Sequence, residues 1–263
     1  MGSATTQAMA ATTAALGAAS DVDLDVAREL FAVARAVADS SQLSGALADS
    51  AAPADARRKV VTDVFGSAVK ATTTSLLTTA VAERWSSADD LIDGIEELAI
   101  RAAAVAEANA DVEAELFAFS RTVADNAELE LALGSRLGDA SAKGALVESL
   151  LGGRASAAST LIAASLVQQP RERRVRQLLS RATRIVADQR GRAVATVVAA
   201  APLSAAQSER LAAALSQRYG TRVSLNTIVD PAVVGGLRVQ IADDVIDASV
   251  SSRLADLRQR LAG

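Results

Sequence analysis

Two stretches of the chain repeat one another, and this repeat constrains the fold more than any other feature of the sequence. Residues 29–66 align without gaps on residues 115–152, with 15 identical positions out of 38, ten of which are not alanine. The blocks Glu-Leu-Phe-Ala and Val-Ala-Asp lie in register in both stretches. A general enrichment in alanine does not produce such blocks, so we infer two copies of one module of about 86 residues.

The apolar residues of both copies recur at the spacing of an α-helix. Between residues 91 and 105 they stand three and four positions apart, which places them on one helix face. These positions are Leu91, Ile95, Leu98, Ala102 and Val105. The same spacing predicts helices over about 111–124, 140–151, 155–168 and 170–190. In the repeated stretches, Leu30, Phe31, Val37, Leu43 and Leu47 are expected to point inward, like Leu116, Phe117, Val123, Leu129 and Leu133.

The helix after residue 88 carries an acidic N-terminal region. Ser86-Ser87-Ala88-Asp89 resembles a capping box, which supplies acceptors to the free N–H groups of a first turn. Five acidic residues follow that do not lie on the apolar face of this helix. They are interpreted either as a cation site or as a solvated face. Negative charge is favourable near a helix N-terminus, so we expect the solvated face. The carboxylates belong to Asp89, Asp90, Asp93, Glu96 and Glu97.

The pattern changes after Gly191. A valine-rich stretch at 192–200 predicts a strand, and Ser204 to Gln207 form a capping box before a helix with Leu211 and Leu215 inward. Residues 223–229 and 237–241 alternate as half-buried strands do, and Ser249 can begin a last helix. We expect the core of this part to contain Leu237, Val239, Ile241, Leu254 and Leu257. The predicted fold is mainly α: helical modules at 1–89 and 90–190 precede a small α/β domain at 191–263.

Composition excludes several kinds of chemistry. The chain has no cysteine and no histidine, which removes disulfides, thiol nucleophiles, Cys/His metal sites and the commonest general base. Catalysis by paired carboxylates stays formally open, although nothing places two of them together. We expect no cofactor and no metal. The longest apolar run, near 193–203, is shorter than the roughly 20 residues that span a bilayer, and no targeting segment stands out near the start of the chain.

Charge is distributed unevenly along the chain. Residues 1–153 carry 11 Lys and Arg against 23 Asp and Glu, whereas residues 154–263 carry 16 against 8. The strongest basic feature is a run of eight arginines between Arg171 and Arg192. It is interpreted as a nucleic-acid patch, as a surface for an acidic partner, or as a solvated face. The acidic total and the 2% aromatic content weigh against nucleic acid. The eight are Arg171, Arg173, Arg174, Arg176, Arg181, Arg184, Arg190 and Arg192.

The end of the chain resembles a known family. Residues 229–261 read VDPAVVGGLRVQIADDVIDASVSSRLADLRQRL and closely resemble the C-terminal signature of the delta subunit of F-type ATP synthases, the oligomycin-sensitivity-conferring protein family. Ala248 stands where that family usually has glycine. The resemblance covers about 175 residues, from about residue 91 onward, and the first 90 residues are extra, as in the longer actinobacterial type. The matching signature residues are Asp230, Pro231, Gly235, Gly236, Asp247 and Ser249.

The resemblance implies a mechanical role without catalysis. In the family, the helical domain holds N-terminal helices of alpha subunits on the catalytic head, and the C-terminal domain holds the b stalk. Together they form a peripheral stalk, or stator, that keeps the head from turning with the rotor during proton-driven ATP synthesis. The chain would then lie at the cytoplasmic face of the cell membrane and reach the membrane only through the complex. The alternative function is a helical nucleic-acid-binding protein that uses the Arg171–Arg192 basic helix.

The resemblance also indicates where an alpha helix would bind. The family's groove lies between the first and fifth helices of the helical domain, which correspond here to about 91–108 and 155–168. The residues expected near this groove are Ile92, Leu98, Val105, Leu161, Ile162 and Leu166. The other interpretation of the same six residues is that they are ordinary core.

Overall fold

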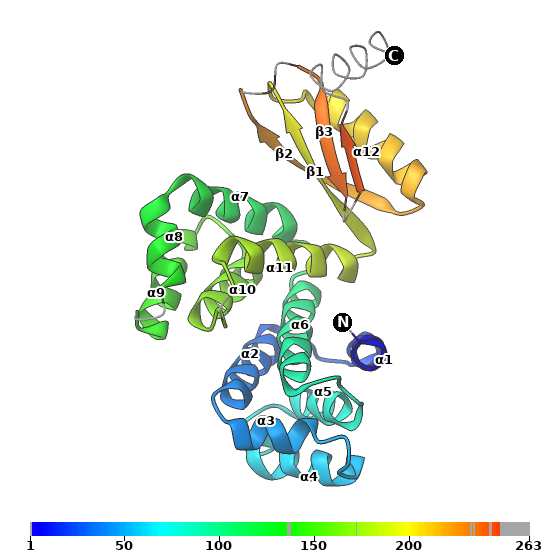
Figure 1. Ribbon diagram of the computed structural model, residues 1–263, viewed down its shortest axis with the longest axis vertical. Helices are drawn as coiled ribbons and strands as arrows, with labels where there is room; N and C mark the ends of the chain where they lie inside the picture. The colour runs from blue at the N-terminus through cyan, green and yellow to red at the C-terminus, as the bar shows by residue number, and fades with distance from the viewer. Residues whose placement is uncertain are drawn as a thin grey trace, which may run out of the picture. The chain divides into compact units, whose positions relative to one another are not determined.

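The computed structural model describes residues 2–135, 138–171, 173–231, 233, 235–241 and 244–247. The chain divides into two compact units, Met1–Val186 and Ala187–Gly263. The first unit is helical, and every strand of the described residues lies in the second (Figure 1). The expected fold class, mainly α with a small C-terminal α/β part, is therefore confirmed. The expected boundary at residue 89 stays a prediction.

Eleven helices are described up to residue 189. Their bounds are α1 Ser3–Ala18, α2 Leu24–Ala38, α3 Ser41–Ala48, α4 Ala54–Phe65, α5 Ala71–Ala82, α6 Ala88–Ala106, α7 Val112–Asp125, α8 Ala127–Gly134, α9 Ala140–Leu151, α10 Ala157–Gln168 and α11 Val175–Gln189.

The helix bounds repeat along the chain. Adding 86 to the bounds of α3, α4 and α5 gives the bounds of α8, α9 and α10 without any difference. The same shift carries α1 to α6, α2 to α7 and α6 to α11 within a few residues. Helix α6 therefore takes part in both copies, as the sixth helix of the first and the first helix of the second.

Hydrogen bonds repeat at the same shift. The Glu29 carboxylate accepts from the backbone N–H of Lys70 at 2.9 Å, and the Glu115 carboxylate accepts from that of Ser156, also at 2.9 Å. Each bond satisfies a free N–H group where α5 or α10 begins. A second matched pair of hydrogen bonds comes from buried side chains: Arg57 donates to the Asp49 carbonyl, and Lys143 donates to the Ser135 carbonyl. Contacts of this kind are not produced by alanine content.

The inward positions of the two copies agree with one exception. Leu30, Val37 and Leu47 are fully buried, as are their counterparts Leu116, Val123 and Leu133, and both Leu43 and Leu129 are partly buried against the core. The exception is Phe31, which is buried, whereas Phe117 is only partly buried. In the second copy Phe119 fills the core instead.

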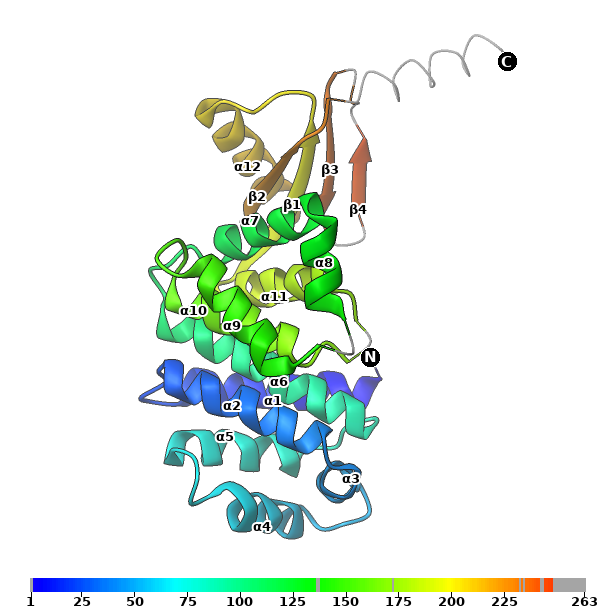
Figure 2. The ribbon, with the colours of Figure 1, turned by 90° about the vertical axis from the view of Figure 1, so that its left-hand side faces the viewer.

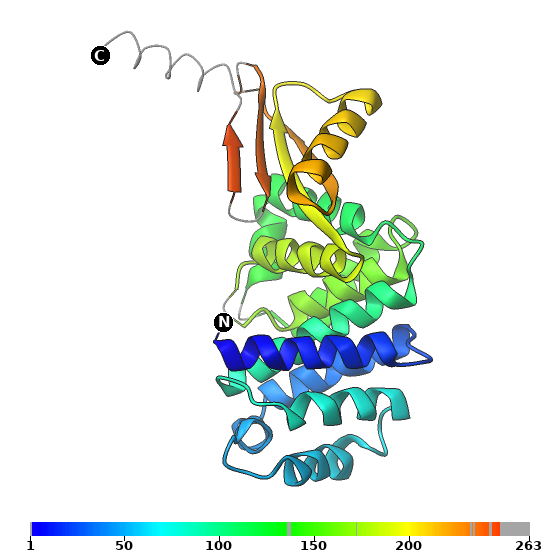
Figure 3. The ribbon, with the colours of Figure 1, turned by 90° about the vertical axis from the view of Figure 1, so that its right-hand side faces the viewer.

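Helix α6 lies at the centre of the helical unit. It packs against α1, α2, α3 and α5 of the first copy and against α10 of the second (Figures 2 and 3). Thirteen of its 19 residues are buried, and the apolar ones belong to one core that runs through all described parts of the unit. Within the unit, Figure 2 shows α6 between α2 and α5 on one side and α9 and α10 on the other.

Two expected helix starts need correction. The N-cap of α6 is Ser87, whose hydroxyl accepts from the Asp90 N–H, and not Ser86. Ser86 is engaged elsewhere, because its hydroxyl and N–H bond the Thr5 hydroxyl of α1. Likewise, α11 begins at Val175, five residues after Pro170, since Arg171 takes a left-handed conformation with φ of 45° that interrupts a helix.

The second unit is a mixed sheet with one described helix. Its elements are β1 Arg192–Ala199, α12 Ala205–Tyr219, β2 Arg222–Val229, β3 Leu237–Ile241 and β4 Asp244–Asp247. The strand order is β2-β1-β3-β4: β1 pairs in parallel with β2, across α12, and antiparallel with β3, which pairs antiparallel with β4. The predicted capping box at Ser204 and Gln207 is present, and Gly220 ends α12 with φ of 68°.

The core of this unit is small. Val239 and Ile241 of β3 are buried, and Leu237 is partly buried, as their alternation predicts. Leu215 is buried on α12, with Leu211 partly buried against the same cluster. The expectation for β2 is only partly met, because Asn226 is buried whereas Val229 is exposed. Leu254, Leu257 and the predicted last helix lie outside the described residues.

Candidate partner-binding surfaces

Helices α6 and α10 form the pair that the family resemblance points to. They contact each other, and the Glu107 carboxylate after α6 accepts from the Ala158 N–H in the first turn of α10 at 2.8 Å. This bond brings the end of α6 to the start of α10. Val105 and Leu161 therefore lie at the same end of the helix pair.

The structure separates the six expected groove residues into two sets. Ile92, Leu98, Ile162 and Leu166 lie in the hydrophobic core, at most 5% exposed. Val105 is 38% exposed, so its expected place on the inward stripe of α6 is wrong, and Leu161 is partly buried. An incoming helix could touch the exposed set directly, whereas the buried set could act only as support beneath it.

The first copy has an open hollow at the corresponding place. A cavity of about 480 Å³ lies between the end of α1 and the start of α5, lined by Ala19, Ser75 and Leu76 among others. Adding 86 to these three positions gives Val105, Leu161 and Ile162. The repeat therefore relates half of the expected groove residues to a hollow between helices.

Two of the five carboxylates of α6 do not lie on a solvated face. Glu96 and Glu97 are buried, although Asp89 is exposed as expected. Arg173 contacts Glu96 through two parallel bonds of 2.8 Å, and Arg181 reaches the same carboxylate at 3.1 Å. Buried carboxylates need partners of this kind because desolvation of an unpaired charge is costly. The solvated-face prediction is therefore wrong for Glu96 and Glu97.

Further charges extend this cluster. Arg101 contacts Glu97 at 2.8 Å one helical turn away, Arg181 contacts Glu97 at 3.4 Å, and Arg171 pairs with Asp93. The pKa of the Arg171 guanidinium is lowered to about 10, first by burial and then by the neighbouring charges of Arg173 and Arg181. The spacing of Glu97 and Arg101 is visible in the sequence, whereas the partners from residue 171 onward are not.

These contacts change the interpretation of the arginine run. Arg171, Arg173 and Arg181 join α6 to the segment before α11 and to α11 itself, and Arg176 pairs with Glu130 of α8 at 2.9 Å. Some of the negative charge of the first part of the sequence is thus neutralised by arginines of the second part, through ion pairs within the chain. Arg171, Arg173 and Arg181 therefore make ion pairs within the protein, which none of the three interpretations of the arginine run predicted.

Four of the six signature residues, Asp230, Pro231, Gly235 and Gly236, lie in the connection between β2 and β3. The Asp230 N–H donates to the Ala199 carbonyl at 2.9 Å, and the Asp230 carbonyl accepts from Val233 across the turn. Gly236 has φ of 82°, a conformation that residues with a side chain rarely adopt, so the second glycine is required by the backbone. Pro231 and Gly235 lie in the same turn, and Asp247 is the last residue of β4. Ser249 lies outside the described residues.

Two features that other functions would need are not found among the described residues. No described helix combines the length and the apolar character needed to cross a bilayer. No group of three or more described acidic side chains is arranged to hold a metal ion.

Comparison with known proteins identifies the family. The model of the ATP synthase delta (OSCP) subunit family matches residues 97–261. The chain is 53% identical over 265 aligned positions to ATP synthase subunit delta of Leifsonia xyli, which covers all of both chains. It is 42% identical to ATP synthase subunit delta of Streptomyces avermitilis, with 94% of this chain and 93% of the relative covered. It is 40% identical to ATP synthase subunit delta of Nocardia farcinica, with 95% of this chain and 94% of the relative covered. The chain therefore belongs to the ATP synthase delta (OSCP) subunit family.

Proposed function

We propose that the chain is a non-catalytic subunit of the peripheral stalk of an F-type, proton-translocating ATP synthase. In this role it links alpha subunits of the catalytic head to the b stalk and resists the torque of the rotor. It lies at the cytoplasmic face of the membrane and is held there by the complex. The observation that carries the proposal is the 53% identity to a subunit of that name over the full length of both chains.

The division into two compact units supports a linking role. A linker needs two independent contacts, and each contact raises the effective concentration of the other partner. We assign alpha to the helical unit and the b stalk to the second unit. Binding of a partner helix needs an apolar groove with a polar rim and requires no catalytic group.

Within the helical unit we place the alpha helix across the ends of α6 and α10. Exposed Val105 and partly buried Leu161 form the apolar edge, and the buried residues Ile92, Leu98, Ile162 and Leu166 support the groove from the core. The hollow in the first copy, lined by Ala19, Ser75 and Leu76, supports this placement because these residues occupy the corresponding positions.

A truncation tests the division of labour between the units. A fragment of residues 1–190 retains α1 to α10 and all of α11. We expect this fragment to bind a peptide of the alpha N-terminus with the affinity of the full chain, measured by fluorescence anisotropy, and to lose the b subunit in a pull-down. Retention of b together with loss of the alpha peptide would reverse the assignment.

A point variant tests the groove itself in the full chain. Leu161→Asp places a charge in the exposed edge, and we expect at least about tenfold weaker alpha binding, or about 1.4 kcal/mol. Leu146→Asp on α9 is the control, since Leu146 is a leucine of the second copy that solvent reaches and that lies outside the α6 and α10 pair. Unchanged coupling of proton flow to ATP synthesis in a reconstituted enzyme lacking the chain would remove the stator role.

A further inference from the structure

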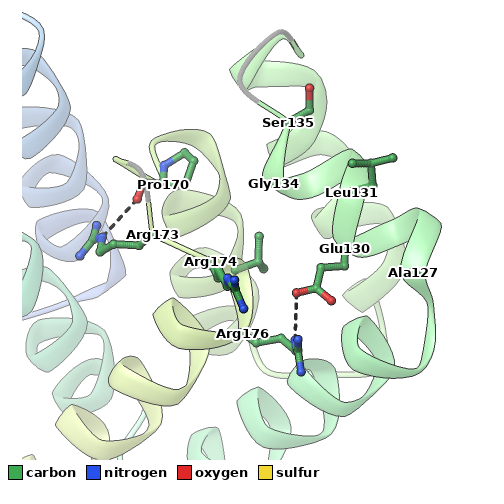
Figure 4. A pocket seen from close by; sticks show the side chains of 10 residues that line it. Ala127, Glu130, Leu131, Gly134, Ser135, Pro170, Arg173, Arg174 and Arg176 are labelled. Carbon is green, nitrogen blue, oxygen red and sulfur yellow. Dashed lines mark hydrogen bonds and ion pairs between the residues drawn. The ribbon is translucent and has the colours of Figure 1, made fainter.

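The two copies differ where their third and sixth helices meet. In the first copy α3 packs directly against α6. In the second copy a pocket of about 530 Å³ lies between α8 and the start of α11 (Figure 4). The third and sixth helices therefore contact each other in the first copy (the closed site), whereas a pocket lies between them in the second copy (the open site). The lining residues are Ala127, Glu130, Leu131, Gly134, Ser135, Pro170, Arg173, Arg174, Val175 and Arg176.

The residues at this place also differ between the copies. Leu131 of α8 is 74% exposed, and the corresponding residue of α3 is Gly45. At the start of the sixth helix, Ser87-Ala88-Asp89-Asp90 of the first copy becomes Arg173-Arg174-Val175-Arg176 in the second. The closed site is thus acidic and has glycine at position 45. The open site is basic and has the exposed side chain of Leu131 at the corresponding position.

The arginines of the open site are only partly neutralised. Figure 4 shows Arg173 directed away from the pocket, in keeping with its pairing to Glu96, while Arg176 reaches across to Glu130. Arg174 has no ion pair among the described residues, and its side chain is exposed at the pocket. A neighbouring hollow along α11 shares Arg174 and Arg176 and adds Arg184, which is exposed and also without an ion pair in the described part.

We propose that this pocket, defined by Leu131, Arg174 and Arg176, binds an acidic amphipathic helix of a partner protein. A large apolar side chain of that helix would cover Leu131, which otherwise stays in water. Carboxylates beside it would pair with Arg174 and Arg184, since arginine forms two parallel bonds to a carboxylate. The volume is suited to one or two anchoring side chains, within the range of about 300–1,000 Å³ typical of binding pockets.

Other anionic partners fit the pocket less well. Among the described lining residues none is aromatic, and single-stranded nucleic acid binds largely by stacking on aromatic side chains. The exposed leucine has no role in binding phosphates. The pocket is separate from the α6 and α10 groove, so the inference does not depend on the proposed stalk function.

The test uses the full chain and a defined probe. The probe is a fluorescein-labelled, end-capped helical peptide of about 18 residues, roughly 27 Å long, with leucines on one face and glutamates beside them. Two matched probes replace all glutamates by glutamine or all leucines by alanine. We expect anisotropy to show tighter binding of the acidic leucine probe than of either matched probe.

Variants of the protein locate the binding. Leu131→Ala and Arg174→Glu should each weaken the acidic probe by at least about tenfold. Leu146→Ala and Arg210→Glu change an exposed leucine and an exposed arginine elsewhere and should leave its affinity unchanged. Trp85 fluorescence and circular dichroism verify that every variant is folded.

Several results would overturn the proposal. One is failure of the acidic probe to bind with a Kd below about 1 mM, and another is equal loss of binding in the control variants. A third is binding of a labelled single-stranded DNA or of phosphatidylglycerol vesicles that Arg174→Glu abolishes and Leu131→Ala leaves unchanged. That outcome would assign the pocket to a phosphate-bearing ligand instead.

Discussion

Replacing Glu96 by glutamine tests whether the buried charge cluster holds α6 to the segment around α11. Glutamine keeps the size of the side chain but removes the charge that faces Arg173 and Arg181 at 2.8 and 3.1 Å. Removing one partner of a buried ion pair costs about 3–5 kcal/mol, because the remaining charge is left without compensation. The arginine side chains are 24% and 21% exposed, and they keep weaker contacts to Asp93 at 3.5 Å and Glu97 at 3.4 Å. Water and these carboxylates partly compensate the two charges, so we expect the lower end, about 3 kcal/mol.

The expected loss is large compared with the stability of a protein of this kind. Native domains are stable by about 5–15 kcal/mol. At roughly 2–4 °C per kcal/mol for a unit of this size, Glu96→Gln should lower Tm by about 6–12 °C. Trp85 is a suitable reporter in urea and thermal unfolding, because it is the single tryptophan of the chain and is packed in the helical unit.

A matched exposed pair provides the control for this experiment. Asp25 and Arg28 form an ion pair whose side chains are 56% and 60% exposed. Exposed pairs contribute about 0–1 kcal/mol, so Asp25→Asn should move the urea midpoint little. If Glu96→Gln also costs less than about 1 kcal/mol, water reaches the cluster in solution and the argument from burial fails.

Three further substitutions test other parts of the fold. Gly94→Ala would place a Cβ atom 2.2 Å from the Trp85 ring. We therefore expect overpacking to lower the free energy of unfolding by about 1–3 kcal/mol and to change the Trp85 emission spectrum. An unchanged spectrum and stability would contradict this. Glu29→Ala and Glu115→Ala remove the same hydrogen bond from the two copies, and each should cost about 1–2 kcal/mol in urea unfolding. A large effect of only one would contradict their equivalence. Gly220→Ala forces a side chain into φ of 68° and should lower the calorimetric stability of the second unit by about 1 kcal/mol, whereas no change would mean that the turn adapts.

Helices, strands and the repeat follow from local properties of the sequence. The helix bounds repeat at the shift of 86 that the alignment of 29–66 with 115–152 implies, and the strands begin at Arg192, one residue after Gly191. Local signals suffice here because a helix or strand is selected by the period of its apolar residues and by the residues at its ends. The capping box at Ser204 and the left-handed Gly220 are two such signals.

Contacts between distant segments were decided by the tertiary structure alone. The sequence shows Glu96 as one more carboxylate near a helix start, and its burial depends on Arg173 and Arg181, about 80 residues away in the chain. The same holds for Ser86, whose role as a cap is replaced by its bond to Thr5. Likewise, the sequence placed Val105 inward by its spacing, but the packing of α6 leaves it exposed.

What the sequence determined by itself is the succession of elements, the duplication and the family. What only the tertiary structure decided is which charges are buried and which helix pairs stay open. The physical reason is that periodicity and capping act within a few residues, whereas desolvation of a charge or exposure of Leu131 depends on every segment packed around it. The closed site between α3 and α6 and the open pocket between α8 and α11 lie at corresponding helices of the two copies, and only the tertiary structure shows which of them is open.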